Sequence, residues 1–367
     1  MVKQHISILA NSDLSYDRRL QRIAGSLRLD GYSVNMTGRC FQGKMPERKE
    51  GEIHLRLWSK RGKLAYLELN IRLFSRMLWQ KTDAICSADL DTLPAAWLAA
   101  KLKGCKLVQD SHEYMAEVPE VSGRAGTQAM WHRIAEWFLP GCHLRYTTSQ
   151  SLVEAFRIRY ASAFSLIRNM PLLQEEIPAK PMPENFPHRD FLVYLGAVNQ
   201  GRGLEEIIEV LSQREEILVI VGEGDKSNEI KKLIDRFQMQ NRVFLTGKLL
   251  PEELPYVLKH ARAGLNLLRD EGLSYRYSLA NKFFDYVHAG IPQICIDFPE
   301  YKSLTQEYGV GLICSLETES IHSALDAMKD PLLQENFRKE ALKARQQWNW
   351  QKEEKTLLEL YRRMFAK

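Results

Sequence analysis

The stretch YLGAVNQGRGLEEIIEVL, residues 194–211, decides the fold. It begins inside the apolar run DFLVYLG (190–196), which predicts a strand, and passes through a loop with Gly201 and Gly203 into a segment whose apolar residues recur at helical spacing. Arg202 stands at the mouth of that predicted helix. A strand that leads through a short loop into a helix is the building unit of α/β domains with parallel sheets. The chain is therefore expected to be an α/β protein.

The same alternation recurs in both halves of the chain. Further apolar runs, each followed by a helical pattern, lie at residues 5–10, 33–38, 83–88, 105–110 and 144–149, and again at 216–222, 242–247, 263–268, 293–297 and 310–315. Two doubly wound, Rossmann-like domains are the expected result. Because ligands bind at the carboxyl ends of the strands in such sheets, we expect the domains to face each other across a cleft.

A proline-rich segment separates the two series of strands. Residues 171–190 contain five prolines and no sustained periodicity, which is typical of an inter-domain linker. The predicted organisation is an N-terminal domain at residues 1–172, a linker at 173–189, a C-terminal domain at 190–345 and a closing segment at 346–367.

Composition is that of a globular protein. The 367 residues are 45% hydrophobic, and no run approaches the about 20 apolar residues that a membrane span needs. Since the first thirty residues carry charges where a signal peptide is apolar, we expect a cytoplasmic protein. The six cysteines are dispersed without a C-x-x-C pair, which favours reduced, buried thiols over disulfides or zinc ligands.

Charge is unevenly distributed. Residues 1–170 hold 25 Lys and Arg residues against 16 Asp and Glu residues, whereas the remainder holds 26 against 30. This asymmetry favours an anionic partner for the front half, such as a membrane surface, a phosphorylated lipid or an acidic glycan. No nucleic-acid partner is expected, because no helix-turn-helix, finger or RNA-binding signature is found.

Residues 60–81 predict a basic helix with a broad apolar face. That face holds Leu64, Leu67, Ile71, Phe74 and Leu78. It can lie on an anionic membrane surface, which would make the protein peripheral to the membrane. The alternative, which we favour, is that the face packs against the domain core and leaves a solvated basic rim.

Two cations stand where the positive end of a helix macrodipole should repel them. Arg202 precedes one predicted helix, and Lys282 lies in the first turn of another, in SLANKFFDYVHAG (278–290). The repulsion at both positions is offset if a phosphate lies between the two cations and accepts hydrogen bonds from the free backbone N–H groups. The alternatives are that both side chains extend into water, and that Asp285 is only an ion-pair partner of Lys282.

The same residues carry a family resemblance. Y-L-G-x-x-x-x-G-R-G, followed by N-K-F-F-D-Y-V-H-A-G-I-P, resembles the nucleotide-sugar-binding domain of the family-4 retaining glycosyltransferases, which have the GT-B fold. The resemblance covers nearly the whole chain. It implies that Gly196, Arg202, Gly203 and Lys282 contact the diphosphate of the donor and that Asp285 contacts its ribose.

Further donor contacts follow from the resemblance. The family's glutamate that contacts the donor sugar is replaced here by Tyr277, with Glu271 or Ser278 as candidate substitutes. Gly222 and Glu223 follow a strand that ends near the base and ribose in the family. The donor-binding candidates are Gly196, Gly203, Gly222, Glu223, Tyr277, Ser278, Asn281 and Asp285.

The front half resembles a bacterial cell-envelope branch of this family, in VQDSHEYMAEVPE (108–120) and SADLDTLP (87–94). The family's cleft histidine, which hydrogen-bonds the donor sugar, maps onto His112. Asp91 is expected to be a cap or polar contact, and NSDLSYDRR (11–19) resembles an acceptor-side D-x-R segment. The catalytic candidates are His112, Arg202 and Lys282, and the acceptor-side candidates are Asp17, Arg18, Asp89 and Glu113. The closing segment resembles the family's terminal helix, which crosses back to the front domain.

The resemblance implies a retaining glycosyltransferase of polysaccharide biosynthesis. It would move a sugar from a nucleoside-diphosphate-sugar to a hydroxyl of a cell-envelope glycan or lipid-linked acceptor, with no cofactor beyond that co-substrate. We expect no metal, because Ala116 occupies the second-histidine position of H-E-x-x-H. Two alternatives stay open: a nucleotide-sugar epimerase of similar architecture, and a degenerate transferase that only binds nucleotide.

Overall fold

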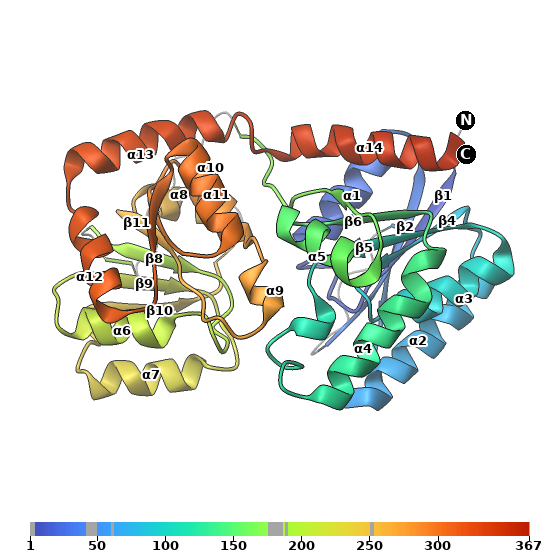
Figure 1. Cartoon of the computed structure of the whole chain (residues 1–367), viewed down its shortest axis with the longest axis horizontal. Helices are drawn as coiled ribbons and strands as arrows, with labels where there is room; N and C mark the ends of the chain where they lie inside the picture. Colours follow the sequence, from blue (N-terminus) through green and yellow to red (C-terminus); the bar gives the residue numbers. More distant parts are fainter. Residues whose placement is uncertain are drawn as a thin grey trace. The chain divides into compact units, whose positions relative to one another are not determined.

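The computed structural model describes residues 4–41, 50–59, 62–174, 186–187, 190–249 and 253–366. The chain divides into two compact units, Met1–Asn169 with Glu353–Lys367, and Met170–Lys352 (Figure 1). Unit 1 thus ends slightly before the predicted residue 172, and the chain returns to it at Glu353 rather than at residue 346. Most of the predicted linker lies outside the described residues.

Unit 1 is built on a seven-stranded parallel sheet of order β3-β2-β1-β4-β5-β6-β7. Its strands are β1 (His5–Leu9), β2 (Ser33–Arg39), β3 (Glu52–Leu55), β4 (Ala84–Ala88), β5 (Lys106–Ser111), β6 (Leu144–Thr147) and β7 (Ser165–Leu166). Its helices are α1 (Arg18–Leu29), α2 (Gly62–Trp79), α3 (Leu93–Lys103), α4 (Ala125–Phe138) and α5 (Gln150–Tyr160), with short 3-10 turns η1 (Met115–Glu117) and η2 (Leu139–Gly141). Because β1 lies between β2 and β4, the order reverses there, as in other doubly wound sheets.

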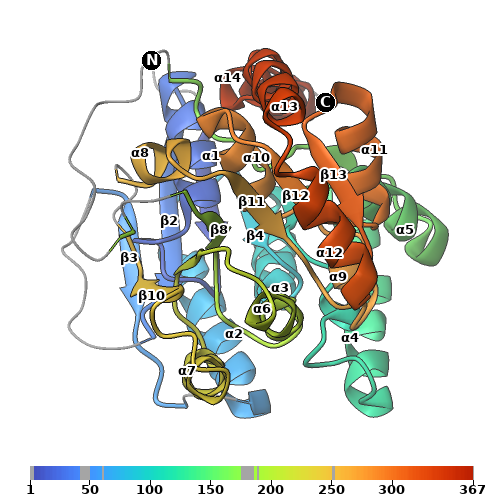
Figure 2. The same cartoon turned by 90° about the vertical axis from the view of Figure 1, so that its left-hand side faces the viewer.

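The last helix, α14 (Trp350–Ala366), packs on unit 1 beside α1 (Figures 1 and 2). Its Tyr361 is fully buried, and the Tyr361 hydroxyl lies 3.4 Å from that of Tyr146. Ser26 of α1 donates a hydrogen bond of 2.8 Å to Glu354. The apolar side of α14 therefore completes the core of unit 1, although Tyr361 is 215 residues away from Tyr146 of β6 in the sequence.

Unit 2 is built on a six-stranded parallel sheet of order β10-β9-β8-β11-β12-β13. Its strands are β8 (Leu192–Leu195), β9 (Leu218–Val221), β10 (Val243–Gly247), β11 (Ala263–Asn266), β12 (Gln293–Ile296) and β13 (Gly311–Cys314). Its helices are α6 (Leu204–Ser212), α7 (Ser227–Arg236), α8 (Leu254–Lys259), α9 (Leu273–Arg276), α10 (Asn281–Ala289), α11 (Pro299–Tyr308), α12 (Thr318–Ala327) and α13 (Pro331–Ala344). Separate apolar clusters cover the two faces of this sheet, which explains why its strands are continuous apolar runs rather than alternating ones.

Local sequence signals account for several helix ends. The Ser149 side chain accepts a hydrogen bond of 3.2 Å from the N–H of Leu152 and so caps the start of α5. Gly290 ends α10 with a φ of 68°, a left-handed conformation that suits glycine. All six cysteines are free, and five of them are buried.

The basic helix packs on the domain core, as favoured, but not through the predicted face. The core-facing residues of α2 are Ala65, Leu69, Leu73 and Met77, whereas four of the five residues of the predicted apolar face, Leu64, Leu67, Ile71 and Leu78, are exposed. The helix has two apolar sides, and the sequence pattern alone does not determine which of them meets the core. No helix in the described part of the chain is both long and apolar enough to cross a membrane.

Glycine is required where the ends of β8 and β9 meet. A Cβ atom at Gly222, whose φ is 143°, would lie 1.9 Å from the backbone oxygen of Gly196. Both partners are backbone held in the sheet by hydrogen bonds, Gly222 N–H to Gly247 and Gly196 N–H to Val221. Neither can retreat without breaking the sheet edge.

Gly222→Ala should therefore lower the free energy of unfolding by about 2 kcal/mol through overpacking. Gly25→Ala is the control, because the added methyl in the interior of α1 meets nothing within 4 Å. That control should raise stability by about 0.5–1 kcal/mol. Chemical denaturation followed by circular dichroism measures both, and equal stability of Gly222→Ala and the wild type would contradict the close approach.

Candidate active site

A glycine-rich loop shapes one corner of unit 2 at the carboxyl end of β8. Gly196, Gly201 and Gly203 all have positive φ, of 136°, 73° and 68°. A Cβ atom at Gly203 would lie 2.6 Å from the Cβ of Leu267, which follows β11. The loop therefore packs its backbone against the neighbouring strand end and brings the start of α6 to this corner.

Lys282 is the most unusual side chain of the corner. It lies in the first turn of α10, is only 5% exposed, and its Nζ lies 3.8 Å from the ring centroid of Tyr194. The Nζ has no hydrogen-bond partner among the described residues. The ring offers a cation–π contact but no counter-charge. The alternative that Lys282 extends into water is therefore wrong.

Arg202 adds a second positive charge to the same corner. Its guanidinium carbon lies 4.8 Å from the ring centroid of Tyr275, and its buried Nε has no hydrogen-bond partner in the described part of the chain. Burial first, and the nearby Arg202 charge second, hold the pKa of Lys282 well below its usual range. Neither α6 nor α10 has a side-chain N-cap. The acidic residues in the first turn of α6, Glu205 and Glu206, pair with Arg269. Arg202 and Lys282 thus stand at the starts of two helices, and neither Arg202 Nε nor Lys282 Nζ has an acceptor among the described residues, which suits an anion-binding site.

The segment around α9 connects to the glycine-rich loop. Gln200 donates a 3.0 Å hydrogen bond to Glu271, and the Tyr275 hydroxyl donates one of 3.3 Å to the carbonyl of Gln200. Of the two candidate substitutes for the family glutamate, Glu271 therefore contacts the loop, whereas the Ser278 hydroxyl donates to the Tyr275 carbonyl at 2.8 Å.

The other donor-binding candidates differ in how far they are exposed to solvent. Asp285 and Tyr277 are half-buried, Asn281 is exposed at the first position of α10, and Glu223 is exposed just after β9. The Lys282 Nζ makes no hydrogen bond to Asp285. Tyr194 and Tyr275 were not identified from the sequence, because a tyrosine in a strand or short helix gives no signal of a cation beside it.

Unit 1 carries a chain of alternating charges at the carboxyl ends of β4 and β5. The buried Arg19 guanidinium donates to Asp110, from Nη2 at 2.8 Å and from Nε at 3.1 Å. The His112 ring lies between two carboxylates, with Nε2 3.0 Å from Asp110 and Nδ1 3.2 Å from Asp89. Asp89 also accepts a 2.7 Å hydrogen bond from the His112 N–H, and its φ of 63° is rare for a residue other than glycine.

The charges of this chain stabilise one another. Burial opposes the charged form of His112, but the Asp110 and Asp89 carboxylates outweigh it and raise the pKa of the imidazole well above its usual value. Burial likewise opposes ionisation of Asp110, yet Arg19 and His112 lower its pKa to about 2. His112 is therefore an imidazolium with a carboxylate at each ring nitrogen. In this arrangement neither N–H is free for the sugar contact that the family resemblance implies.

The acceptor-side candidates have different surroundings. Asp17 is the N-cap of α1, where it accepts hydrogen bonds from the Leu20 N–H at 3.0 Å and from the Ser12 hydroxyl at 2.6 Å. Arg18 is half-buried, but its neighbour Arg19 is the arginine that reaches the charge chain. Arg19 lies one turn before the buried Ile23, so helical spacing offered a signal for its inward position.

Two more carboxylates complete this part of unit 1. Glu113 is exposed directly after His112. Asp91 is buried and accepts a 2.7 Å hydrogen bond from Asn11, which agrees with the predicted polar contact. Burial, with the Asp89 charge, raises the pKa of Asp91 to about 7. No group of three or more His, Cys, Asp or Glu residues is arranged to hold a metal ion within the described ranges.

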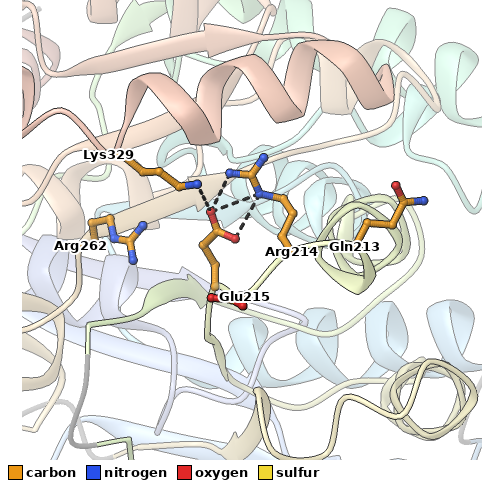
Figure 3. Close-up of a pocket in the computed structure, with 6 residues that line it drawn as sticks. Gln213, Arg214, Glu215, Arg262 and Lys329 are labelled. Carbon is orange, nitrogen blue, oxygen red and sulfur yellow. Dashed lines mark hydrogen bonds and ion pairs between the residues drawn. The ribbon is translucent and has the colours of Figure 1, made fainter.

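A polar hollow of about 530 Å³ lies at the opposite, amino-terminal edge of the unit 2 sheet (Figure 3). Its cations are compensated: Arg214 pairs with Glu216 at 2.7 Å and Arg262 with Asp190 at 2.6 Å. Lys329 pairs with Glu216 at 3.4 Å. These charges satisfy one another, so this hollow lacks the uncompensated charge that distinguishes the Lys282 corner.

The charge chain of unit 1 predicts a pH-dependent stability. The pKa of His112 is higher in the folded protein than in the unfolded chain, where it is about 6.5. The protonated His112 therefore stabilises the fold fully below pH 6.5, and this stabilisation is lost as the pH rises through the pKa of the folded protein. The free-energy difference between wild type and His112→Gln should therefore fall by about 1 kcal/mol per pH unit above pH 6.5. Urea unfolding from pH 6 to 9 measures this, and a difference that stays constant would contradict the imidazolium.

Two protein families match the chain. Residues 178–348 match the glycosyl transferases group 1 family, and residues 16–164 match the glycosyl transferase 4-like domain. A curated relative, chitobiosyldiphosphodolichol beta-mannosyltransferase of Candida albicans, is 25% identical over 134 residues, which are 36% of this chain. That match spans only 27% of the relative's own length.

Solved structures resemble the whole chain. Sucrose-phosphate synthase from Thermosynechococcus elongatus has a TM-score of 0.82 at 17% identity, over 99% of this chain and 100% of that one. Anabaena Alr3699/HepE, in complex with UDP and glucose, has a TM-score of 0.74 at 15% identity, over 97% of this chain and 99% of that one. Both likenesses concern the fold. Together with the two family matches, they identify the chain as a glycosyltransferase of group 1 with the GT-B fold.

Proposed function

We propose that this glycosyltransferase moves a sugar from a nucleoside-diphosphate-sugar to a hydroxyl of a cell-envelope glycan or lipid-linked acceptor, with retention of configuration and without a metal or resident cofactor. The observation that carries the proposal is the buried Nζ of Lys282, which has no hydrogen-bond partner in the described part of the chain and lies beside Arg202 at the starts of α6 and α10. A pyrophosphate supplies the two things that this corner lacks, negative charge and hydrogen-bond acceptors.

The proposed chemistry depends on the leaving group. As the bond between sugar and phosphate breaks, negative charge grows on the departing diphosphate. Arg202 offers a planar pair of donors to that group, Lys282 offers a point charge, and the free N–H groups of two helices point at it. Their charges are in place before the reaction, so the developing charge is stabilised without reorganisation. Retention follows from the family resemblance, with same-face attack and the departing phosphate as base.

The proposed donor is a uridine nucleotide. The Anabaena neighbour was solved with UDP and glucose, which supports a UDP-sugar. The family resemblance supports Asp285, on α10 one turn after Lys282, as the contact to the ribose. It likewise supports Glu223, just after β9, as a contact near the ribose and base. In unit 1, we propose that the positive charge of His112 acts electrostatically on the substrate. Asp89, Arg18 and Glu113 are the proposed residues of the acceptor side.

The proposed acceptor is lipid-linked. The name of the Candida albicans relative describes a sugar joined through a diphosphate to dolichol, which supports an acceptor of that class here. The cytoplasm, with peripheral contact at the membrane, is the corresponding proposed location.

Arg202→Ala and Lys282→Ala should each weaken UDP binding about 10- to 100-fold, the scale of one charged hydrogen bond of about 1.5–3 kcal/mol. In the protein without ligand the pKa of Lys282 is lowered, whereas a bound diphosphate favours the protonated side chain. Binding of UDP to the wild type should therefore be coupled to uptake of a proton when the pH is near or above the lowered pKa. Titration calorimetry at several pH values, in buffers of different ionisation enthalpy, measures both quantities. Lys282→Met should abolish the proton uptake, whereas the exposed Lys339→Ala is the matched control and should change neither. Unchanged affinity in both corner variants would refute the phosphate assignment.

Transfer itself is tested with a radiolabelled UDP-sugar and a bacterial lipid extract. We expect an organic-soluble labelled product, formed equally well in EDTA, with the anomeric configuration of the donor in its NMR spectrum. Lys282→Ala should lower kcat/KM at least about 100-fold, since it removes charge that the transition state needs. Conversion of the donor without an acceptor would indicate an epimerase, and tight UDP binding without any turnover would indicate a protein that only binds.

A further inference from the structure

Arg269 lies shortly after β11 and contacts the loop that leads from β8 into α6. Its backbone N–H donates a 2.9 Å hydrogen bond to the carbonyl of Gly201. Two residues earlier, Leu267 meets Gly203 so closely that a Cβ atom on the glycine would lie 2.6 Å from the Cβ of the leucine. The end of β11 and the glycine-rich loop are therefore fixed to each other, and the Arg269 side chain starts next to the first turn of α6.

Three carboxylates surround the Arg269 guanidinium. Its Nε donates to Glu206 at 2.5 Å, and its two Nη atoms lie 3.6 Å from Glu205 and 3.7 Å from Glu271. Glu205 and Glu206 lie in the first turn of α6, whereas Glu271 accepts a 3.0 Å hydrogen bond from Gln200 of the loop. One arginine is thus the shared counter-charge of three acidic groups around the glycine-rich loop.

Two glutamates at the start of α6 are unfavourable for a phosphate site. Acidic side chains in the first turn stabilise a helix, because they lie in the positive field of its N-terminus. The same field attracts a diphosphate to the free N–H groups of the helix, and both carboxylates belong to the first turn, which is about 5.4 Å long. Without a counter-charge, Glu205 and Glu206 would repel the ligand and compete with it for the Arg202 guanidinium.

Arg269 removes this conflict. Within the described part of the chain, both glutamates form their ion pairs with Arg269 and not with Arg202. The Arg202 guanidinium lies instead over the ring of Tyr275, and its Nε has no described acceptor. The pairing at Arg269 therefore leaves Arg202 available to an anion.

We propose that Arg269 is a positioning residue of the donor site. It holds and neutralises Glu205 and Glu206, so that the start of α6 and Arg202 can bind the diphosphate of the donor. Arg269 acts through these two glutamates and not by contact with the substrate. The inference rests on the proposed function, because it takes the ligand of this corner to be a diphosphate.

UDP binding to the full-length protein, measured by titration calorimetry at low salt, tests the proposal. Arg269→Met removes the charge and should weaken UDP binding about 5- to 10-fold, since two uncompensated carboxylates then face the ligand. Arg269→Lys keeps the charge and should bind UDP within about 2-fold of the wild type. The control Arg276→Met removes an arginine of the same segment whose partner, Asp270, lies outside α6, and should bind UDP as the wild type does.

Two further measurements separate this effect of charge from a general loosening of the loop. Adding Glu205→Gln and Glu206→Gln to Arg269→Met should restore the UDP affinity to within about 2-fold of the wild type, because neutral amides do not repel a diphosphate. In about 1 M salt, the loss caused by Arg269→Met alone should fall below about 2-fold relative to the wild type at the same salt, since the Debye length is then about 3 Å.

The outcomes distinguish this inference from the proposed function. Equal UDP affinity of the wild type and Arg269→Met would overturn the inference and leave the proposed function intact. A loss that persists with both glutamines and in high salt would also overturn it, because Arg269 would then support only the fold of the loop. A wild type that does not bind UDP would refute the proposed function, and this inference with it.

Discussion

The buried ammonium of Lys282 is the constraint on which the unit 2 corner depends. An ion out of water needs a counter-charge or hydrogen-bond acceptors, and here the described neighbours of the Nζ include an aromatic face and a second cation. Such a site is unfavourable when empty and favourable when a diphosphate enters it. The fold tolerates this cost because α10 is fixed by its buried face, where Phe283, Phe284 and Tyr286 are almost fully buried.

The two units treat charge in opposite ways. In unit 1, Arg19, Asp110, His112 and Asp89 alternate in sign, so each buried charge is satisfied by the next. Such a chain fixes geometry, and it needs no ligand to be stable. In unit 2, Arg202 and Lys282 have the same sign and no described acceptor at their buried nitrogens. Binding energy for an anion is therefore concentrated in unit 2, whereas unit 1 presents a rigid, preorganised surface.

Short apolar runs that alternate with helical patterns predicted all six strands of the unit 2 sheet and five of the seven in unit 1, because buried strands in such sheets have no polar side. The edge strands β3 and β7 were missed, because runs of four and two residues give no clear pattern. Arg202 and Lys282 were also predictable, since a cation at a helix N-terminus conflicts with the local field. Arg19 and Tyr194 were not identified, because their partners are distant in sequence: Asp110 lies on β5, and Lys282 lies on a helix far from β8. Periodicity detects which residues share a face, but only packing decides what that face meets.

The helix α2 shows this limit most clearly. Its smaller line, led by Ala65, faces the core, while the bulkier side with Leu64, Leu67 and Ile71 faces outward. Burying the bulkier side would remove more apolar area from water, at about 25 cal/mol per Å². The close approach of α2 to its neighbours favours the line that contains alanine, as at the 2.8 Å hydrogen bond from Asn70 to the carbonyl of Asp91. Because the side with Ala65 packs on the core, the bulkier side with Leu64, Leu67 and Ile71 remains exposed to solvent. This exposed row is therefore a consequence of how α2 packs in unit 1.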